Sequence, residues 1–541
     1  MITSRIKIFV DKNEFDFDDR GYEAGENFNL NAETSVSKLK QHFFGVLEGL
    51  GELVRYSTVD ATLDSELARA LSSPDTLIAC FHEAPPNLPC RLLQHTKGGL
   101  MLTGGFLGKW TFDHPATVSI VTSAHQADRL TKSFRHLPVR FFPLNPTIDS
   151  HFFEGGFVGS PEDAGRQTNQ LIYAGRWIAN KGLCQLIRGM NRWNCGVKTL
   201  EMIGEFEQGF QISQSGGTHA NYPAFHAREA IERNQSLQIR ATPSMSPAKL
   251  AVHFHKATAF AYPSFHEDEN YGLAPREAAA CGAIPIVTDW CGLGEFGKNA
   301  CGGLVRTWAT LGGVRFSLKE MSKEVARIVS WPVEKKQNAF EINRRLVRSE
   351  CSGANSLQQM TQALETLLAL TPAPPPGGEW RCSSRLERLV SHGPPSFRNI
   401  PLHRSCSDPE GLYVDGLGFN EQNYSEAKLL TAIQGLYTTW PAPPEVRPGI
   451  RLHGFWRIGL WHDERALVEF GFPGPRLLRF SNSDWHVVSA SAKPLSQGDF
   501  AFDIRNSRAA DVFQRTIELG YLVPDDPMEC KMPEPNCERF L

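Results

Sequence analysis

Residues 261–296 read AYPSFHEDENYGLAPREAAACGAIPIVTDWCGLGEF, and this stretch decides the fold. An apolar run ends at Ser264 and an acidic loop follows; a small-residue segment then leads to Gly282 and a second apolar run, AIPIVTD. Short apolar runs on either side of a helical pattern are typical of a strand–helix–strand unit in a parallel sheet. The stretch therefore predicts an α/β fold, with a glycine-containing loop that follows AIPIVTD and ends at Glu295.

The same alternation extends through most of the first 370 residues. Other short apolar runs are IKIFV, TLIACFH, GGLMLTG, TVSIVTS, QLIYAGR and TLEMIGE, and most are followed by a helical pattern. Alternation of this kind predicts parallel sheets that are covered by helices on both faces. Because this length exceeds what one such sheet needs, we expect two doubly wound, Rossmann-like domains.

Loop-rich and proline-rich segments indicate where the domains end. The loop composition of SHFFEGGFVGSPEDAGRQTN places a junction near 150–170, and TPAPPPGG, which begins at Thr371, cannot continue a helix. We predict an N-terminal Rossmann-like domain at 1–160, a second one at 161–370, a linker at 371–395 and an accessory domain at 396–541. The last is predicted to be β-rich, because runs such as ALVEFGF and WHVVSAS alternate with turn residues.

Composition narrows the class of protein. Of 541 residues, 41% are hydrophobic and 21% charged, which excludes a mainly disordered chain, and a net charge of -3 provides no overall basic field for nucleic acid. No run of about 18 apolar residues predicts a membrane span. The N-terminal apolar stretch is interrupted by Asp11 and indicates a strand, not a secretory signal. We expect a cytoplasmic protein with buried free thiols and no nucleic-acid partner; peripheral membrane contact stays open.

Two glutamates lie near the start of the helix predicted after the acidic loop. Glu269 comes just before it, and Glu277 stands eight residues later, about one turn inside. The start of a helix offers free backbone N–H groups to a phosphate, and Gly272 allows close approach of the backbone. The two carboxylates can accept hydrogen bonds from sugar and ribose hydroxyls. Such a spacing alone is equally a solvated helix face, but the strand–loop–helix–strand frame favours a ligand site.

A second motif follows the apolar run QLIYAGR. Gly175-Arg176 ends this run, and Lys181-Gly182 precedes the next helical pattern. Two cations beside a leaving group would stabilise the negative charge that develops on it. Alone the motif is weak, because a lysine in such a motif is more often a surface lysine.

Together the two motifs resemble the donor site of retaining glycosyltransferases of the GT-B type, in the large family usually numbered four (glycosyl transferases group 1). The resemblance rests on Pro263-Ser264, Glu269–Leu273, Glu277-Ala278, Cys281–Pro285, Gly175-Arg176 and Lys181-Gly182. Two more residues lie between Ser264 and Glu269 than in the commonest form of the motif. The resemblance extends over roughly residues 1–370 and is strongest from 165 to 300.

The resemblance implies two Rossmann-like domains facing a cleft, with a nucleotide-sugar donor held by the second domain. It assigns catalytic roles to Arg176, Lys181 and Glu269, of which the two cations pair with the donor diphosphate. The donor-binding residues that it implies are Gly175, Asn270, Tyr271, Gly272, Leu273, Glu277 and Glu295. No metal or other cofactor is implied, because Arg176 and Lys181 take the place of a metal cation.

The N-terminal region departs from the family pattern. The run IKIFV is followed by an acidic segment without the usual pair of glycines, and GGLMLTGGFLG carries Gly104-Gly105 where many members have a histidine. His82, which closes TLIACFH on the preceding strand, is the candidate for that catalytic position. The acidic segment is either a solvated loop or part of an acceptor site.

We therefore expect a metal-independent, retaining glycosyltransferase that uses a nucleotide sugar in polysaccharide or glycoconjugate biosynthesis. Its acceptor is left open among glycans, glycolipids, proteins and small molecules. The alternative is a catalytically degenerate GT-B scaffold that acts as a binding or regulatory protein. A phosphorylase of related fold is a further alternative, but nothing resembling a pyridoxal-binding lysine site is found. Trp456, Trp461 and Trp485 could stack on sugar rings or form the core of the accessory domain.

Overall fold

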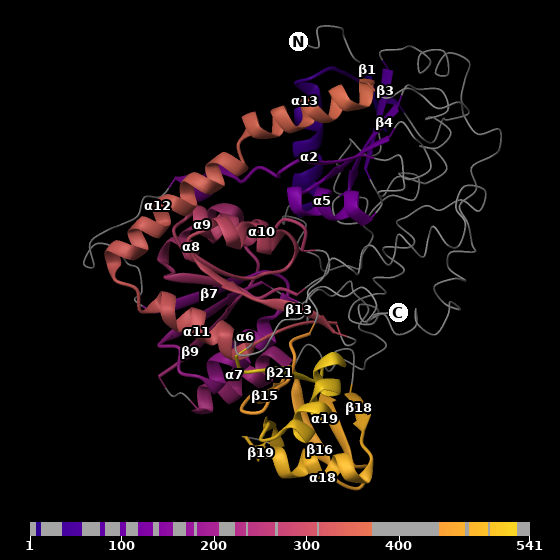
Figure 1. Cartoon of the computed structure of the whole chain (residues 1–541). Helices are drawn as coiled ribbons and strands as arrows, with labels where there is room; N and C mark the ends of the chain where they lie inside the picture. The colour runs from indigo at the N-terminus through magenta and orange to yellow at the C-terminus, as the bar shows by residue number, and fades with distance from the viewer. Residues whose placement is uncertain are drawn as a thin grey trace, which may run out of the picture. The chain divides into compact units, whose positions relative to one another are not determined.

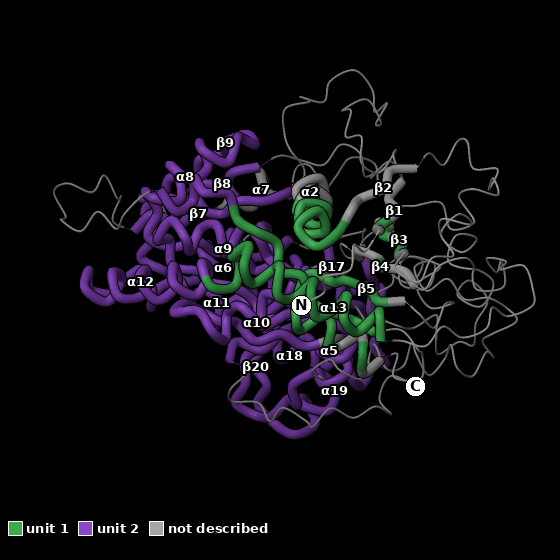
Figure 2. The backbone as a smooth tube through the Cα atoms, turned by 90° about the horizontal axis from the view of Figure 1, so that it is seen from above, with its two compact units in different colours: residues 1–148, 349–398, 410–439 green, residues 149–348, 399–409, 440–541 purple. Residues whose placement is uncertain are grey.

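The computed structural model describes fifteen stretches of the chain. These are residues 7–11, 35–56, 76–81, 98–103, 117–133, 140–154, 169–177, 181–204, 222–233, 236–265, 269–310, 313–369, 443–470, 475–495 and 498–526. They form two compact units (Figure 2). Unit 1 takes the described residues up to Ile148 and returns at Ser349, and unit 2 takes 149–348 together with the described residues from 443. The predicted linker at 371–395 lies outside the described residues.

Unit 1 is built on a six-stranded parallel sheet. The strand order is β2-β1-β3-β4-β5-β6. The strands are β1 (Lys7–Asp11), β2 (Glu52–Tyr56), β3 (Thr76–Phe81), β4 (Gly98–Thr103), β5 (Thr117–Val121) and β6 (Arg140–Pro143). Among the described residues before 148, the helices are α2 (Ser35–Glu48) and α5 (Ala124–Ser133). The apolar runs IKIFV, TLIACFH, GGLMLTG and TVSIVTS thus form strands, as predicted.

Helix α13 (Gly353–Ala369) belongs to unit 1 by its packing. Its buried face, with Met360 and Leu364, joins the same hydrophobic core as Ile8 and Phe43. Its first turns also bond the segment after β6, since the Gln359 side chain accepts from the Asn145 N–H at 2.9 Å. The predicted boundary at 370 groups this helix with the second domain, whereas the apolar stripe of the helix is covered by unit 1.

Unit 2 holds a second six-stranded parallel sheet, in the order β12-β11-β10-β7-β8-β9. Its strands are β7 (Gln170–Ala174), β8 (Thr199–Ile203), β9 (Gln238–Thr242), β10 (Ala259–Tyr262), β11 (Ile284–Thr288) and β12 (Gly303–Val305). In Figure 1, helices α6 (Leu183–Arg192), α7 (Tyr222–Arg233) and α11 (Leu318–Val329) lie on one side of this sheet. Helices α8 (Pro247–Lys256), α9 (Leu273–Ala280) and α10 (Cys291–Asn299) lie on the other. Two doubly wound sheets confirm the predicted α/β, GT-B type of fold.

Four further elements complete this part of unit 2. A short 3-10 helix, η1 (Ser150–Phe153), precedes β7, and an antiparallel pair, β13 (Thr307–Thr310) and β14 (Gly313–Phe316), follows β12. The long helix α12 (Val333–Glu350) then leads to α13. The chain thus passes between the units at 148–149 and again at 348–349.

The C-terminal domain, residues 443–526, belongs to unit 2 and has antiparallel sheets, as predicted for the β-rich region. Its strands are β15 (Arg451–Gly454), β16 (Arg457–Trp461), β17 (Ala466–Phe470), β18 (Pro475–Arg479), β19 (Ala492–Pro494), β20 (Phe500–Asp503) and β21 (Leu522–Pro524). It also contains α18 (Asn482–Ser491) and α19 (Ser507–Glu518), which the sequence analysis does not predict. The run WHVVSAS, taken above as a sign of β-structure, lies in α18, so that local prediction is wrong. Residues of both helices and of both sheets share one core.

Another local prediction is also wrong: the segment that ends at Glu295 is helix α10 and not a loop. The glycines of this segment suggest a loop, but the helix needs them because neighbouring atoms leave no room for a Cβ. A Cβ on Gly292 would lie 2.0 Å from the carbonyl oxygen of Asn270, and one on Gly294 would lie 2.4 Å from a carboxylate oxygen of Asp289. The helix can therefore approach the acidic segment closely only because these positions lack side chains. No helix in the described residues is long and apolar enough to cross a membrane.

Candidate functional site

The two sequence motifs meet at the centre of the unit 2 sheet. Strands β7 and β10 are neighbours, but the chain continues from β7 toward β8 and from β10 toward β11, on opposite sides. Such a topological switch point leaves a crevice outside the carboxyl ends of the two strands, where ligands of open α/β sheets bind. Arg176 and Lys181 follow β7, and Glu269 follows β10. The sheet order thus brings together motifs that are about ninety residues apart.

A buried ion pair joins the two motifs. The Lys181 Nζ donates to Oε2 of Glu269 at 2.5 Å, and both residues are 7% exposed. Ser264, in the turn after β10, donates its hydroxyl to the same oxygen at 2.7 Å. Burial of two charges is tolerated only when they are paired and hydrogen-bonded, as they are here. Lys181 is therefore held by the structure and is not the surface lysine that the motif alone also allowed.

Two tyrosines, one on β7 and one on β10, lie close to the Lys181–Glu269 pair. Tyr173 of β7 and Tyr262 of β10 stack with ring centroids 5.7 Å apart, and the Lys181 ammonium lies 5.8 Å from the Tyr262 ring centre. Burial raises the pKa of Tyr262 well above its usual value, and the nearby Glu269 carboxylate raises it further. The charge of Arg176 acts in the opposite direction on the pKa values of both tyrosines. The guanidinium of Arg176, an exposed residue, therefore lies near these two tyrosines.

The helices that start at this point begin after glycines. Gly182 before α6 and Gly272 before α9 have left-handed φ values of 76° and 77°, and no side chain caps either helix. A Cβ on Gly182 would lie 2.1 Å from the carbonyl oxygen of Pro263, so the start of α6 packs directly on the end of β10. Glycine is favoured in such a conformation. Uncapped first-turn N–H groups and the helix dipole favour an anion there.

The segment between Glu269 and α9 is locked by backbone contacts. The carbonyl of Glu269 accepts from the N–H of Gly292 in α10 at 3.0 Å. Arg276, which is almost completely buried, donates to the carbonyl of Tyr271 and lies 3.8 Å from the centre of that ring. These contacts fix the backbone on which Glu269, Asn270 and Gly272 stand. A preorganised segment of this kind suits a site that must hold a ligand in one orientation.

This part of the chain matches a known family. Residues 161–307 match the model of the family described as glycosyl transferases group 1. The chain carries a glycosyl transferase domain of group 1. We use this name for residues 149–348 of unit 2, which contain the match. The matched segment runs from before β7 to β13 and includes the switch point, the Lys181–Glu269 pair and helix α9. The match confirms the predicted family and the predicted enzyme class, a nucleotide-sugar-dependent glycosyltransferase.

Several solved structures are similar to this chain. One is a glycosyltransferase from Rickettsia africae, with 11% sequence identity, coverage of 68% of this chain and 100% of that chain, and a TM-score of 0.47. Another is a sucrose-phosphate synthase from Thermosynechococcus elongatus, with 16% identity, coverage of 68% of this chain and 100% of that chain, and a TM-score of 0.46. A third is the Anabaena protein HepE in complex with UDP and glucose, with 12% identity, coverage of 67% of this chain and 100% of that chain, and a TM-score of 0.41. These likenesses are too distant to assign a substrate. A comparison with curated protein sequences found no match.

The glycosyl transferase domain places most of the predicted site residues in one region. Gly175 directly follows β7; Asn270, Tyr271 and Gly272 are buried directly before α9; Leu273 and Glu277 lie on α9, and Glu295 lies on α10. Glu277 and Glu295 are half-buried. His82 lies outside the described residues, so its predicted catalytic role stays a prediction.

Three residues of the glycosyl transferase domain were missed as site residues. Ser264 and Tyr262 contact Glu269 or Lys181, and Arg276 holds the backbone before α9. Ser264 could have been found, because the Pro-Ser pair at the strand end is part of the motif. Arg276 could have been suspected as the one charged neighbour of Glu277 among small residues in APREAAACG. Tyr262 gives no such sign, since an aromatic residue in a buried strand is usually core.

Proposed function

We propose that the chain is a metal-independent, retaining glycosyltransferase whose nucleotide-sugar donor binds at the switch point of the unit 2 sheet. The observation that carries the proposal is the buried Lys181–Glu269 pair, which lies next to two helix starts that follow glycines and have no side-chain cap. A cation, uncapped N–H groups and carboxylates beside one another suit a diphosphate joined to a sugar. The acceptor is a glycan, glycolipid, protein or small molecule.

Each residue has a role that follows from its position. Lys181 and Arg176 stabilise the charge that develops on the departing diphosphate, and Glu269 keeps the Lys181 ammonium in place. A lysine has three N–H donors, so the bond to Glu269 leaves others for phosphate oxygens. Asn270, Tyr271, Gly272 and Leu273 present backbone groups near the start of α9, and Glu277 and Glu295 accept from donor hydroxyls.

Catalysis then consists mainly of orientation and electrostatic stabilisation. Two fixed cations beside the leaving diphosphate supply the charge stabilisation that a bound metal would otherwise give. The leaving phosphate can assist removal of the acceptor proton, so that retention needs no covalent intermediate on a side chain. Six cysteines of the described part of the chain are free thiols, which supports a cytoplasmic location: Cys184, Cys195, Cys281, Cys291, Cys301 and Cys351.

The test is hydrolysis of nucleotide sugars by the purified full chain without an acceptor. The panel contains UDP-, GDP-, ADP- and TDP-glucose, and we expect the chain to hydrolyse at least one. Arg176→Ala should lower this rate by about 100-fold, because a charge-stabilising group is lost. The control Arg345→Ala removes an equally exposed arginine on α12 and should leave the rate unchanged.

Two outcomes contradict the proposal. If the folded chain hydrolyses none of the four nucleotide sugars and none shifts its melting temperature, the degenerate scaffold is the better description. If Arg176→Ala retains the wild-type rate, the assigned charge stabilisation is wrong.

A further inference from the structure

The C-terminal domain offers few aromatic side chains for stacking on a glycan. Trp456 and Trp485 are 4% and 8% exposed and belong to the interior, and Trp461 is 47% exposed. The described residues of this domain contact the glycosyl transferase domain, within the same unit, at several places. These contacts include three groups.

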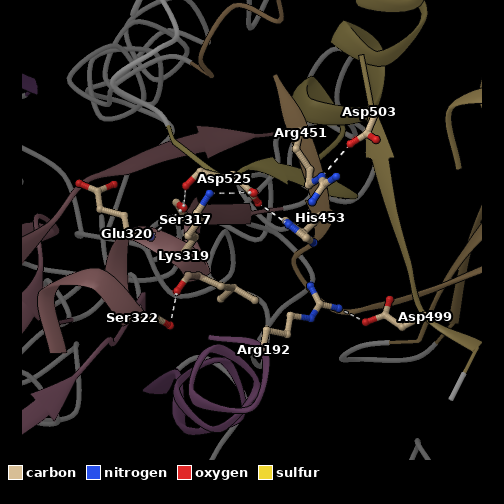
Figure 3. Close-up of polar contacts among 11 residues, drawn as sticks. Arg192, Ser317, Lys319, Glu320, Ser322, Arg451, His453, Asp499, Asp503 and Asp525 are labelled. Carbon is tan, nitrogen blue, oxygen red and sulfur yellow. Dashed lines mark hydrogen bonds and ion pairs between the residues drawn. The ribbon is translucent and has the colours of Figure 1, made fainter. Parts of the chain in front are cut away.

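The first group holds helix α6. Asp499, between β19 and β20, accepts from Arg188 at 3.0 Å and also pairs with Arg192, both through Oδ2 (Figure 3 shows the Arg192 contact). Its Oδ1 accepts the backbone N–H groups of Ile458 and Phe500, each at 3.0 Å. Arg188 and Asp499 are both buried. A carboxylate with four donors, two of them arginines, holds α6 in a single orientation.

The second group holds the end of β10. Phe455, which is completely buried, contacts Phe265 edge-on with ring centroids 5.3 Å apart, and contacts Phe316 of β14 in the same way. Its carbonyl oxygen also accepts from Arg188 at 2.5 Å. The Phe455 segment therefore touches α6 and the residue after Ser264 at the same time.

The third group lies at the start of α11. The Ser317 hydroxyl donates to the carbonyl of Asp525 at 2.7 Å, and Lys319 pairs with the Asp525 carboxylate at 3.3 Å. Figure 3 shows Asp525 between these residues and His453 of β15. Burial lowers the pKa of His453, although the adjacent Asp525 raises it in part. This group fastens the C-terminal domain to the glycosyl transferase domain without reaching the switch point.

The first two groups end on the elements that carry the Lys181–Glu269 pair. Helix α6 begins two residues after Lys181, and Asp499 holds its second half. Phe265 directly follows Ser264, whose hydroxyl donates to Glu269. Because helices and packed aromatic rings transmit displacement with little deformation, a shift at Asp499 or Phe455 would move Lys181 against Glu269.

We propose that the C-terminal domain is a positioning part of the donor site, in which Asp499 and Phe455 set the geometry of Lys181 and Glu269. The inference rests on the proposed function, because it concerns the same donor site. Asp499 and Phe455 are positioning residues: they touch no donor atom and act through α6 and Phe265.

The experiment compares four variants of the full chain. Phe455→Ala and Asp499→Asn remove the two contacts, and Phe455→Leu keeps most of the buried volume. The control Phe513→Leu changes a completely buried residue in the core of the C-terminal domain, which packs on Phe502. All are measured well below their melting temperatures, so that loss of folding does not enter.

The first readout is hydrolysis of the nucleotide sugar that the wild-type chain hydrolyses fastest. We expect Phe455→Ala and Asp499→Asn to lower kcat by up to about 100-fold, the effect of displacing a reacting group by roughly 1 Å, with a smaller change in KM. Phe455→Leu should recover part of the rate, and Phe513→Leu should keep it. A merely structural role would lower the melting temperature of all variants without this kcat difference.

The second readout, amide hydrogen exchange of the chain without any donor, does not depend on activity. Exchange in α6 and at residues 259–265 should increase in Phe455→Ala and Asp499→Asn but not in Phe513→Leu. Equal exchange and equal kcat in all variants would overturn the inference. If the wild-type chain has no donor activity but the exchange differs as expected, the proposed function fails and the positioning contact stands.

Discussion

Five helices of unit 2 begin in two contrasting ways. At the switch point, α6 and α9 follow glycines in the left-handed conformation and have no side-chain cap. Away from it, Ser317, Ser481 and Asn506 cap α11, α18 and α19, each accepting a backbone N–H in the first turn. A capping side chain satisfies an N–H group and stabilises the helix, whereas a glycine leaves the group for another acceptor. Under the proposed function, the starts of α6 and α9 are the ones available to a ligand; α8 and α10 also lack a side-chain cap but do not follow a left-handed glycine.

Replacement of Lys181 should have the largest effect on turnover, because it removes the buried cation beside the starts of α6 and α9. We expect Lys181→Met to lower kcat by about 100- to 1,000-fold. The change also leaves Glu269 buried without its cation, at a cost in the free energy of unfolding of about 3 to 5 kcal/mol. Steady-state kinetics and denaturant unfolding measure the two effects, and Lys249→Met, at an exposed lysine of α8, is the control.

The double variant Lys181→Met with Glu269→Gln separates stability from catalysis. It buries no unpaired charge, so most of the lost stability should return while kcat stays low. Recovery of turnover in this variant would show that Lys181 matters only for folding, and the contrast between the two kinds of helix start would lose its functional meaning.

Replacement of Gly182 should have an intermediate effect. In Gly182→Ala the new Cβ would meet the Pro263 carbonyl at 2.1 Å, at a φ of 76°. The strained backbone alone costs about 1 to 3 kcal/mol, and the start of α6 must move away from β10. We expect donor affinity, measured by calorimetry, to fall by about tenfold or more. Gly353→Ala is the matched control, since no atom lies within 4 Å of its Cβ. Equal donor affinity in the two variants would contradict the prediction.

Replacement of a capping residue should have the smallest effect. Asn506→Ala removes the acceptor for the Ala509 N–H at the start of α19, at 2.9 Å, and should cost about 1 kcal/mol in the free energy of unfolding. Donor affinity and kcat should stay at wild-type values. A loss of donor affinity in this variant would break the separation between structural and ligand-facing helix starts.

The strands and the donor motif could be predicted from local sequence. The apolar runs around β7, β8, β10 and β11 are short and bounded by turn residues, so their period and length identify them. The glycines before α6 and α9 mark the helix starts correctly, whereas those inside α10 were taken for a loop. The difference has a physical reason. At Gly182 and Gly272 the left-handed backbone conformation favours glycine, whereas at Gly292 the carbonyl oxygen of a distant residue leaves no room for a Cβ. Only the first requirement is local.

The remaining parts of the site depend on contacts between distant residues. Nothing in the sequence around Arg188 indicates that it bonds Phe455 and Asp499, which are 267 and 311 residues away. Likewise, the small-residue pattern of α9 does not show that Arg276 turns inward to the Tyr271 carbonyl. Side-chain burial at such positions is decided by what packs over them.

The sequence by itself determined the α/β class, the existence of strands and helices, and the residue types of the donor motif, because these depend on periodicity and on short-range backbone conformation. The tertiary structure decided the strand order that places Lys181 beside Glu269, the return of α13 to unit 1, and the attachment of the C-terminal domain to α6 and β10. These features depend on which apolar faces and buried charges meet across the fold, and no local pattern specifies their partners.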